Sequence, residues 1–492
     1  MSLLEVASFT LSFTQYEAGL RRVRLRVLDG MDLEVDTGEL VAVVGASGSG
    51  KSLLAHAICG VLPANATEGG VIRYDGRELT QARRERLRGE EIALVPQSVG
   101  FLDPLARAGQ QTRRAADLAG VADPATAAAE AYRRLELPAQ VAGRFPHELS
   151  GGMARRVLAA TATIGSPRLV LADEPTPGLH QSLAAETLRG LRKLADNGAA
   201  VVVITHDLRA ATEIADRIAV FNAGRTVEVA APAAFSGAGD GLAQPYSRAL
   251  LDALPGNGFG VDDLAAVPAA AAPGATAPTQ PGGDAGLTAS GLRFRHPGGD
   301  DWLIDGVDLT VRPGEVVGLR GPSGRGKTTL AKLLAGYLEP AAGTVHVDGR
   351  ALPRRGMAPV QLVFQHPELA IDPRWRMHEV LEEAGEVDMD TLRELHIRPE
   401  WLLRHPNELS GGELQRFAVA RALATGAGYV VADEVSAMLD AITQARIWRV
   451  LLRRVRSGGL GLLAISHDGD LLARVADRVV DLGAPATEPA AT

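Results

Sequence analysis

Short apolar runs bounded by turn residues recur along the chain, for example at residues 41–44, 169–172 and 200–204, and predict buried parallel strands. Between such runs lie stretches with helical periodicity that are rich in alanine and arginine, at about residues 100–164 and, in shorter form, 377–424. Strands, a helix, a mostly helical stretch and further strands follow one another in that order. This order predicts an α/β core into which a helical subdomain is inserted.

The same series of landmarks occurs twice. The pattern Gly-x-x-x-x-Gly-Lys-Ser/Thr contains Lys51 in the first copy and Lys327 in the second, and each follows an apolar run. The later landmarks repeat in order: Gln97 and Gln365, Leu149-Ser150-Gly151-Gly152 and Leu409-Ser410-Gly411-Gly412, Asp173-Glu174 and Asp433-Glu434, and His206 and His467. The spacing from serine to aspartate is 23 residues in both copies (173 minus 150 and 433 minus 410). The chain is therefore an internal duplication.

At 492 residues the chain is too long for one ordinary core and suits two domains. We expect a first domain over residues 1–255, a linker over 256–286 and a second domain over 287–492. The linker is rich in alanine, proline, glycine and threonine, which predicts a flexible or partly extended tether. An ordered helix in its alanine-rich part is the alternative.

Charge and cysteine content narrow the classes of partner. The net charge of -8 and a pI near 5.8 give no general attraction to nucleic acid or anionic lipid, although a local basic patch remains possible. Cys59 falls among apolar residues of an expected helix and is interpreted as a buried small hydrophobe rather than a reactive thiol. The N-terminus lacks a basic segment followed by a long apolar one, and the apolar runs fall short of the roughly 20 residues of a membrane helix. We expect a cytoplasmic protein that reaches a membrane only through a partner.

The two glycine-rich patterns predict nucleotide-binding loops. Their glycines let successive backbone N–H groups curl around a β-phosphate at a helix N-terminus. The positively charged lysine can then pair with the negative charge of the phosphates, and the hydroxyl of Ser52 or Thr328 can ligate Mg²⁺.

The two Asp-Glu pairs each end an apolar run, which places them at the C-terminal edge of a parallel sheet, where doubly wound folds bind ligands. The aspartate can hold Mg²⁺ through water, and the glutamate can orient or deprotonate an attacking water. Acidic residues at a strand end can also merely cap the next helix. Their register with a phosphate loop favours the catalytic interpretation.

His206 and His467 also follow apolar runs, and an imidazole at such a strand end can contact a γ-phosphate. The two Ser-Gly-Gly elements, directly before helical patterns, offer a hydroxyl and backbone N–H groups as a second anion-binding device in each copy. One nucleotide does not need two such devices in one domain. We expect each copy to offer its Ser-Gly-Gly element to the nucleotide held by the other.

With these motifs in this order, the chain resembles a fused pair of ATP-binding cassette (ABC) transporter ATPases over nearly all of its length except the tether. The resemblance implies an α/β fold of two tandem P-loop NTPase domains, each with a RecA-like core, an antiparallel β subdomain and an inserted helical subdomain. It also implies ATP and Mg²⁺ as cofactors, ATP hydrolysis coupled to transmembrane transport, and two composite ATP sites formed where the tandem domains pair.

The resemblance assigns roles to matching positions of this sequence. Catalytic roles fall on Glu174, Glu434, His206, His467, Lys51 and Lys327. Nucleotide contacts fall on Gly45, Ser47, Gly48, Ser49, Gly50, Lys51, Ser52, Leu53, Gln97, Ser150, Gly151 and Gly152, and on Gly321, Ser323, Gly324, Arg325, Gly326, Lys327, Thr328, Thr329, Gln365, Ser410, Gly411 and Gly412. Mg²⁺ contacts fall on Ser52, Gln97, Asp173, Thr328, Gln365 and Asp433. Phe13 and Phe294 are candidates to stack on adenine, and Tyr16 competes with Phe13.

The chain departs from the family pattern at a few positions. Met153 and Glu413 stand where the signature often has glutamine, which we interpret as a mild change. The family's D-loop aspartate is present as Asp440, but the first copy has His180 there. Because both copies retain the lysine, aspartate, glutamate, histidine and signature serine, we expect both to hydrolyse ATP, at rates that can differ.

Residues 244–255 resemble the C-terminal segment of ATPases that serve oligopeptide, dipeptide and nickel importers, although an amphipathic helix ended by proline is the alternative. Residues 97–104 and 365–374 resemble the stretch that follows the Q-loop in ATPases of the same branch. The first phosphate loop with residues 60–63 looks most like the first ATPase of a nickel importer, and residues 434–440 look like the second. We therefore expect nickel or another chelated metal slightly ahead of a peptide as cargo.

The resemblance implies two transmembrane permease subunits and, through them, a solute-binding protein as partners, no nucleic acid, and a peripheral place at the cytoplasmic face of the cell membrane. The rival class is a soluble tandem ATPase of translation or DNA repair. Such proteins need a large basic or coiled-coil element, whereas this tether is nearly uncharged. A purely regulatory nucleotide-binding protein is disfavoured because both catalytic glutamates are present. Whether the halves pair within one chain or between two chains stays open.

Overall fold

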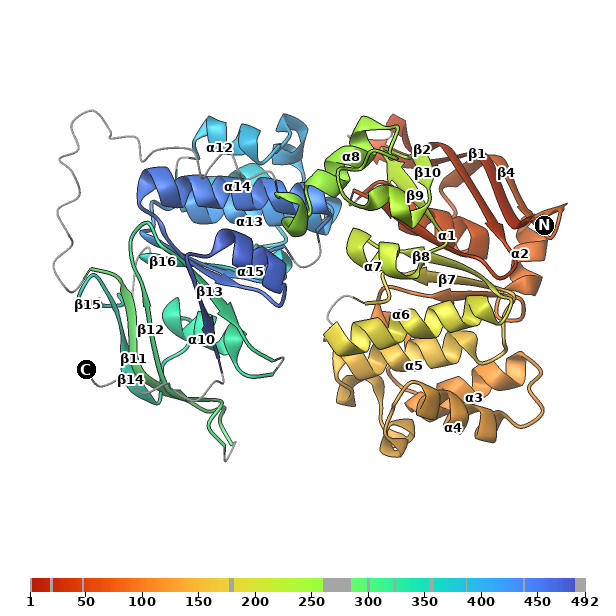
Figure 1. Ribbon diagram of the computed structural model, residues 1–492, viewed down its shortest axis with the longest axis horizontal. Helices are drawn as coiled ribbons and strands as arrows, with labels where there is room; N and C mark the ends of the chain where they lie inside the picture. Colours follow the sequence, from red (N-terminus) through yellow and green to blue (C-terminus); the bar gives the residue numbers. More distant parts are fainter. Residues whose placement is uncertain are drawn as a thin grey trace. The chain divides into compact units, whose positions relative to one another are not determined.

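The computed structural model describes residues 2–17, 21–46, 48–176, 181–259, 285–298, 301–322, 324–353, 358–385, 387–436 and 439–482. These residues form two compact units, Met1–Leu251 and Asp252–Thr492 (Figure 1). Each unit contains an antiparallel sheet, a mainly parallel sheet and an inserted group of helices. The expected α/β class with two tandem domains is confirmed.

The antiparallel sheet of the first unit has the order β2-β1-β4-β5, from β1 (Ser2–Glu17), β2 (Arg21–Asp36), β4 (Ala66–Tyr74) and β5 (Arg77–Glu78). The second sheet has the order β10-β9-β3-β8-β7-β6. Its strands are β3 (Leu40–Gly45), β6 (Ile92–Val95), β7 (Leu169–Asp173), β8 (Ala200–Ile204), β9 (Arg217–Asn222) and β10 (Arg225–Ala230), and only the β9–β10 pair is antiparallel among the described pairs. The three central strands are buried along their whole length because both faces of the sheet are covered.

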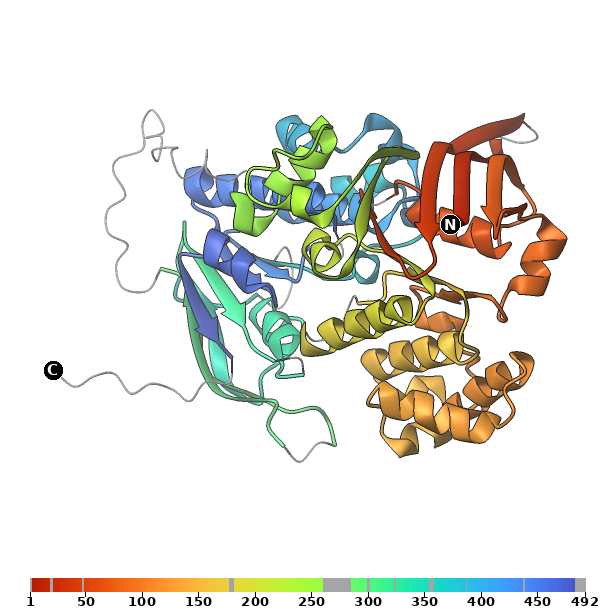
Figure 2. The same cartoon turned by 45° about the vertical axis from the view of Figure 1, so that its right-hand side comes forward.

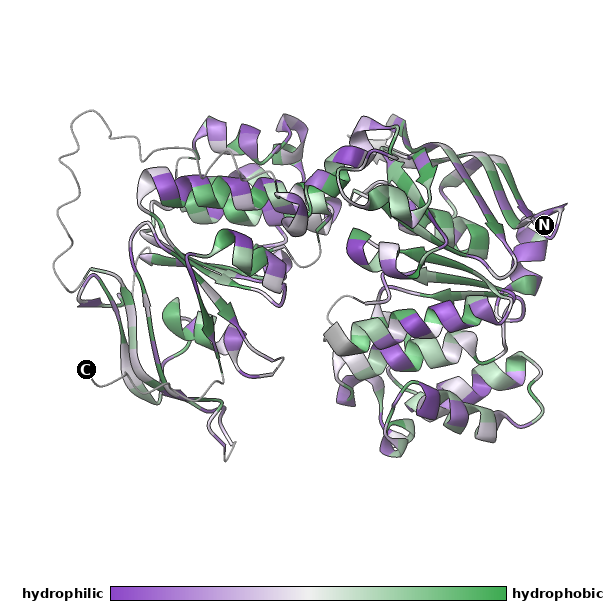
Figure 3. Ribbon diagram, viewed as in Figure 1, coloured by the Kyte–Doolittle hydropathy of each residue, from purple (hydrophilic) through white to green (hydrophobic). Residues whose placement is uncertain are grey.

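Two cores lie on opposite faces of this parallel sheet. Alternate strand residues pack with α1 (Lys51–Cys59) and the antiparallel sheet on one face, and with α6 (Gln181–Asp196) on the other. Figure 3 shows the hydrophobic residues gathered on these strands. The remaining helices are α2 (Gln81–Leu87), α7 (Leu208–Ile214) and α8 (Pro245–Asp252). Cys59 is buried in the first of these cores, as expected.

The inserted helices of the first unit are α3 (Ala108–Leu118), α4 (Pro124–Arg134) and α5 (Gly151–Thr163), and they have a core of their own. In both Figure 1 and Figure 2, α3 and α4 lie on the far side of α5 from the parallel sheet. Of these helices, α3 and α4 lie in the chain between Gln97 and the Ser-Gly-Gly element, where the sequence predicts the insertion, and α5 begins at Gly151 of that element.

The second unit repeats this plan. Its antiparallel sheet has the order β12-β11-β14-β15, from β11 (Leu287–Phe294), β12 (Ile304–Val311), β14 (Ala342–Val347) and β15 (Arg350–Ala351). Its parallel sheet has the order β16-β17-β18-β13-β19, from β13 (Val316–Arg320), β16 (Val360–Val363), β17 (Tyr429–Asp433), β18 (Gly461–Ile465) and β19 (Arg478–Asp481). The helices are α10 (Lys327–Leu334), α11 (Met377–Ala384), α12 (Met389–Glu394), α13 (Gly411–Ala424), α14 (Ala441–Gly458) and α15 (Gly469–Val475). Among the described helices, none combines the length and apolar character that crossing a bilayer requires.

The stretch after α8 differs from the expected linker. Ala253 and Phe259 pack in the core of the second unit, and Phe259 is fully buried. The carbonyl of Gly258 accepts a hydrogen bond from Arg474 of α15 (3.2 Å). The second unit therefore begins before residue 256, because an apolar aromatic side chain provides an anchor that composition alone does not reveal. Residues 260–284 of the expected linker lie outside the described residues.

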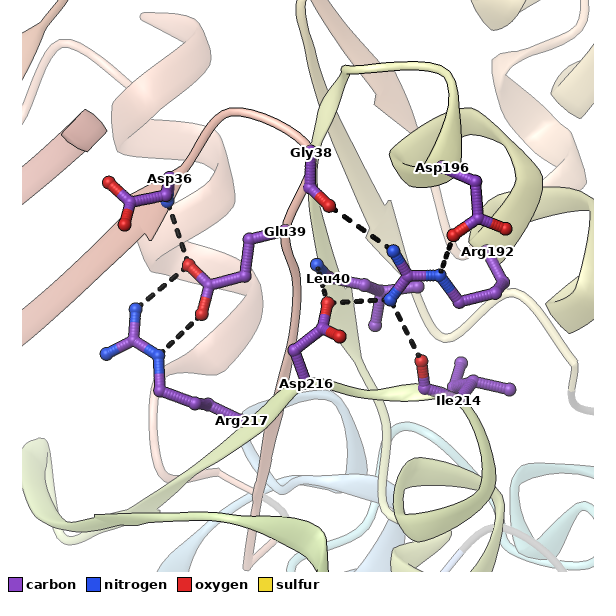
Figure 4. Close-up of polar contacts among 9 residues, drawn as sticks. All are labelled: Asp36, Gly38, Glu39, Leu40, Arg192, Asp196, Ile214, Asp216 and Arg217. Atoms are coloured by element: carbon purple, nitrogen blue, oxygen red, sulfur yellow. Dashed lines mark hydrogen bonds and ion pairs between the residues drawn. The ribbon is translucent and has the colours of Figure 1, made fainter. Parts of the chain in front are cut away.

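An ion-pair cluster fixes the start of β3, the strand that leads to the first phosphate loop (Figure 4). Asp216 accepts the Leu40 N–H (2.8 Å) and pairs with Arg192 of α6 (2.6 Å). Glu39 pairs in the same way with Arg217 (2.9 Å). We call this cluster the strand clamp.

The second unit has a matching strand clamp at the start of β13. There Asp477 accepts the Val316 N–H (2.7 Å) and pairs with Arg456 of α14 (2.6 Å), while Glu315 pairs with Arg478 (2.6 Å). The duplication therefore extends to charged pairs that the sequence analysis did not identify.

Candidate nucleotide sites

The first phosphate loop joins β3 to α1 through glycines whose positions exclude a side chain. A Cβ at Gly45 would lie 1.8 Å from the carbonyl oxygen of Phe221, and one at Gly50 would lie 2.1 Å from Leu28 Cδ2. Gly48 and Gly50 have φ values of 78° and 91°, in the left-handed region that favours glycine. The loop is therefore built for glycine at these points.

The second loop joins β13 to α10 in the same way. Gly324 and Gly326 have φ values of 80° and 87°, and a Cβ at Gly326 would lie 2.8 Å from Ile304 Cδ1. The expected nucleotide contacts that follow these loops, Ser52, Leu53, Thr328 and Thr329, lie in the first turn of α1 or α10. Ser47 and Ser323 lie outside the described residues.

Both lysines are buried and fold over their loops. Lys51 Nζ donates to the carbonyls of Gly45 (2.9 Å) and Ala46 (2.8 Å). Lys327 Nζ donates to the carbonyls of Gly321 (2.8 Å) and Pro322 (3.2 Å), and burial lowers its pKa. Each loop thus combines a helix N-terminus with an ammonium group, an arrangement that suits phosphate.

A hydroxyl and a carboxylate meet beside each loop. Ser52 Oγ donates to Asp173 Oδ1 (3.0 Å), and burial raises the pKa of Asp173 to about 6 against the opposing effect of this hydrogen bond. In the second unit Thr328 hydrogen-bonds Asp433, whose pKa burial also raises. A buried carboxylate that is costly to ionise alone fits a divalent cation, and hydroxyl and carboxylate oxygens are ligands that Mg²⁺ accepts.

Gln97 and Gln365 follow β6 and β16, the strands that pair with those ending in Asp173 and Asp433. Gln97 is exposed and Gln365 is half-buried. Their expected contacts with metal and nucleotide stay predictions.

The two glutamates have an unusual backbone. Glu174 and Glu434 have φ values of 47° and 48°, a region that costs a non-glycine residue about 1 kcal/mol or more. Glu174 Oε2 lies 2.9 Å from His206 Nδ1, and Glu434 Oε1 lies 2.7 Å from His467 Nε2. Both units thus have the same strained glutamate in contact with a histidine, and the catalytic role of these groups stays a prediction.

The glutamate in the first unit changes the pKa of its histidine. Burial disfavours the charged ring of His206, but the Glu174 carboxylate outweighs this effect and the pKa of His206 is raised. In the second unit His467 Nε2 also lies 3.2 Å from Lys327 Nζ, so lysine, histidine and glutamate form one chain of contacts. The predicted catalytic groups of each unit are thus brought together.

The signature serines cap helices. Ser150 Oγ accepts a hydrogen bond from Met153 N at the start of α5, and Ser410 Oγ accepts one from Glu413 N at the start of α13 (3.3 Å each). Gly151 and Gly411 are exposed. Arg155 of α5 donates to the carbonyl of Glu174 (3.3 Å), which ties the first signature helix to the end of β7.

The adenine candidates differ in burial. Phe13 of β1 is half-buried against the first core. Phe294 is only 8% exposed and lies edge-on to His296, with ring centroids 5.3 Å apart, so little of its ring is available for stacking. The side chain of Tyr16 and all of His180 lie outside the described residues. Asp440 is buried and caps α14 by accepting from Thr443 N (3.0 Å).

Tyr246 contacts the first phosphate loop. The sequence analysis used its segment, residues 244–255, only for the resemblance to peptide and nickel importer ATPases. Tyr246 of α8 is half-buried, and its hydroxyl accepts a hydrogen bond from Ala46 N (3.0 Å). The two residues are 200 positions apart in the sequence, so no local sequence pattern predicts this contact and only the fold reveals it.

Replacing Tyr246 by phenylalanine should raise the ATP concentration that half-saturates the first unit by about threefold to tenfold, the effect of losing one hydrogen bond that fixes the loop. Photolabelling with 8-azido-ATP, followed by cleavage between the units, measures each unit separately. Tyr337→Phe, at an exposed tyrosine of the second unit, is the matched control. If labelling of the first unit reached half-saturation at the same nucleotide concentration as in the wild type, a role for the Tyr246 hydroxyl would be contradicted.

Comparison with known proteins agrees with this geometry. Residues 28–177 and 304–437 match the ABC transporter family. The chain is 32% identical to the glutathione import ATP-binding protein GsiA of Pectobacterium atrosepticum, over 97% of this chain and 84% of that protein. It is 30% identical to the oligopeptide transport ATP-binding protein OppD of Mycobacterium tuberculosis, over 97% of this chain and 93% of that protein.

Among solved structures, an RNase-L inhibitor matches with a TM-score of 0.62 and 24% identity, over 96% of this chain and 87% of that chain. This likeness shows the fold alone. The family match in both halves and the similarity along almost the whole chain lead to one conclusion: the chain belongs to the ABC transporter family and is an ATPase with two nucleotide-binding domains.

Proposed function

We propose that this protein is the ATP-hydrolysing subunit of an importer for peptides, with two composite sites in which each phosphate loop is completed by a signature serine from the other domain. The observation that carries the proposal is the paired set of lysine, aspartate, glutamate and histidine in both units. One catalytic copy would suffice for a simple ATPase. Two intact copies in one chain suit a motor whose halves close together on two ATP molecules.

In each site the loop N–H groups and the ammonium of Lys51 or Lys327 hold the β- and γ-phosphates. Glu174 or Glu434 orients the attacking water and takes its proton, and the neighbouring histidine contacts the γ-phosphate. Ser52 with Asp173, and Thr328 with Asp433, would hold Mg²⁺, which would supply positive charge to neutralise the phosphate oxygens. Closure on ATP and opening after hydrolysis move the helical subdomains, on which two permease subunits dock at the cytoplasmic face of the membrane.

Cargo is inferred from relatives. The names of the similar proteins refer to glutathione and oligopeptides, which favours a peptide over the nickel or chelated metal expected from sequence motifs. The likeness to an RNase-L inhibitor is a likeness of fold and gives no support of its own to a role in translation.

The proposal is tested by purifying the tagged full-length chain from its native membranes in mild detergent. We expect two multi-span membrane proteins to co-purify. In proteoliposomes, the matching solute-binding protein loaded with glutathione or a short peptide should stimulate ATP hydrolysis. Stimulation by the nickel-loaded protein alone would reassign the cargo, and co-sedimentation with ribosomes without permeases would refute the transport role.

A further inference from the structure

The two signature serines have different hydrogen-bond partners. Ser410 Oγ donates to Glu413 Oε2 (2.9 Å), and Ser410 N donates to the same oxygen (2.8 Å). Glu413 N in turn donates to Ser410 Oγ (3.3 Å). A serine hydroxyl can donate one hydrogen bond, and here it already donates that bond to a carboxylate.

The first signature lacks this carboxylate. Met153 occupies the position of Glu413, and a thioether is uncharged and a weak acceptor. Ser150 Oγ accepts from Met153 N (3.3 Å), which leaves its proton without an acceptor among the described residues. Ser150 is exposed, whereas Ser410 is half-buried.

We propose that Glu413 masks the second signature loop, so that this loop binds phosphate more weakly than the first and makes the two composite sites unequal. The inference rests on the proposed function, in which Ser410 completes the site that contains Lys51. Glu413 is a positioning residue because it acts through the hydroxyl and N–H groups of Ser410.

Two physical effects support the proposal that Glu413 weakens phosphate binding at the second signature loop. A phosphate that approaches Ser410 must replace the Glu413 carboxylate as acceptor of the hydroxyl's hydrogen bond, whereas the hydroxyl of Ser150 can donate to phosphate without such a replacement. In addition, the carboxylate neutralises the positive N-terminal end of α13 and repels the incoming anion. A unit negative charge a few ångströms from a phosphate weakens binding on the order of tenfold at a partly exposed site.

The ordinary role of this pair is a capping box, in which serine and glutamate satisfy each other's backbone N–H groups at a helix start. That role stabilises α13 and predicts no difference between the ATP sites. The experiment therefore separates the charge of Glu413 from its capping contacts.

The test uses the full-length chain in a Glu174→Gln, Glu434→Gln background, with a protease site introduced between residues 260 and 284. After photolabelling over a range of 8-azido-ATP concentrations with Mg²⁺, cleavage separates the halves and each label is counted. We expect the first half to need about tenfold more nucleotide than the second. Glu413→Gln, whose amide oxygen can still accept from Ser410 N, and Glu413→Met should both move the first-half curve to lower concentration. Met153→Glu should move the second-half curve to higher concentration.

Serine variants keep this test distinct from that of the proposed function. If Ser150→Ala and Ser410→Ala change neither curve, the composite sites themselves are contradicted. If Ser410→Ala weakens labelling of the first half but Glu413→Gln and Glu413→Met leave it unchanged, the composite sites stand and the mask is overturned. If Glu413→Met alone shifts the curve, the effect belongs to the helix cap and the charge mask is likewise overturned. Thermal unfolding of each variant confirms that the chain remains folded.

Discussion

Replacing Glu174 and Glu434 together by glutamine should lower the rate of ATP hydrolysis by about 10² to 10⁴-fold, the usual contribution of a positioned general base. The amide cannot take a proton from water, but it retains the size of the carboxylate and one acceptor oxygen. Nucleotide binding should therefore persist while turnover is lost. Phosphate release and 8-azido-ATP labelling measure the two properties independently.

The single variants assign the activity to each site. Glu174→Gln removes the carboxylate that contacts His206, and Glu434→Gln removes the one that contacts His467. Each should reduce turnover substantially, because the proposed closure on two nucleotides couples the sites. Glu90→Gln, at an exposed position away from the loops, is the matched control. A Glu174→Gln protein with wild-type activity would show that the first site is idle.

Replacing Phe259 by alanine should destabilise the second unit by about 3–5 kcal/mol, the usual range for losing a buried aromatic side chain. Phe259 is fully buried in a core shared with α14 and α15, so the substitution leaves a cavity that the surrounding side chains fill only in part. The chain offers a selective probe of this effect. All four tryptophans, at positions 302, 375, 401 and 448, belong to the second unit, so tryptophan fluorescence during urea unfolding reports on that unit.

The matched control is Phe101→Ala, at a phenylalanine of the first unit that is 63% exposed. That change should shift stability by no more than about 0.5 kcal/mol. If Phe259→Ala left the fluorescence midpoint where it is in the wild type, the segment after α8 would not be part of the second core.

The sequence analysis identified the groups whose positions follow from local rules. Glycine-rich loops after apolar runs place lysines at helix starts, and acidic pairs at the ends of parallel strands meet at one edge of the sheet. For these reasons the contacts Ser52–Asp173, Glu174–His206 and Glu434–His467 join residues that the motifs had already singled out.

Other features depend on tertiary contacts that no local pattern specifies. Tyr246 reaches Ala46 across the fold, and Phe259 is buried although its neighbours in the sequence are small and polar. Phe294 shows the opposite case: its aromatic ring suggested an adenine contact, but the ring is used in the core. Glu413 is a different case: it was interpreted as a mild departure because the phosphate contacts come from the preceding serine and glycines, and its local capping contact with Ser410 was not considered.

The strand clamps restrict which parts of each domain can move when a nucleotide binds. Asp216 and Asp477, each paired with an arginine, hydrogen-bond the first residues of β3 and β13 and fix these strands at the ends opposite the phosphate loops. Because one end of each strand is fixed in this way, we expect the strand to stay in place when a nucleotide binds at the loop at its other end. We therefore expect the proposed movement on nucleotide binding to occur outside these strands, and we expect loss of Arg192 or Arg456 to weaken its coupling to ATP hydrolysis.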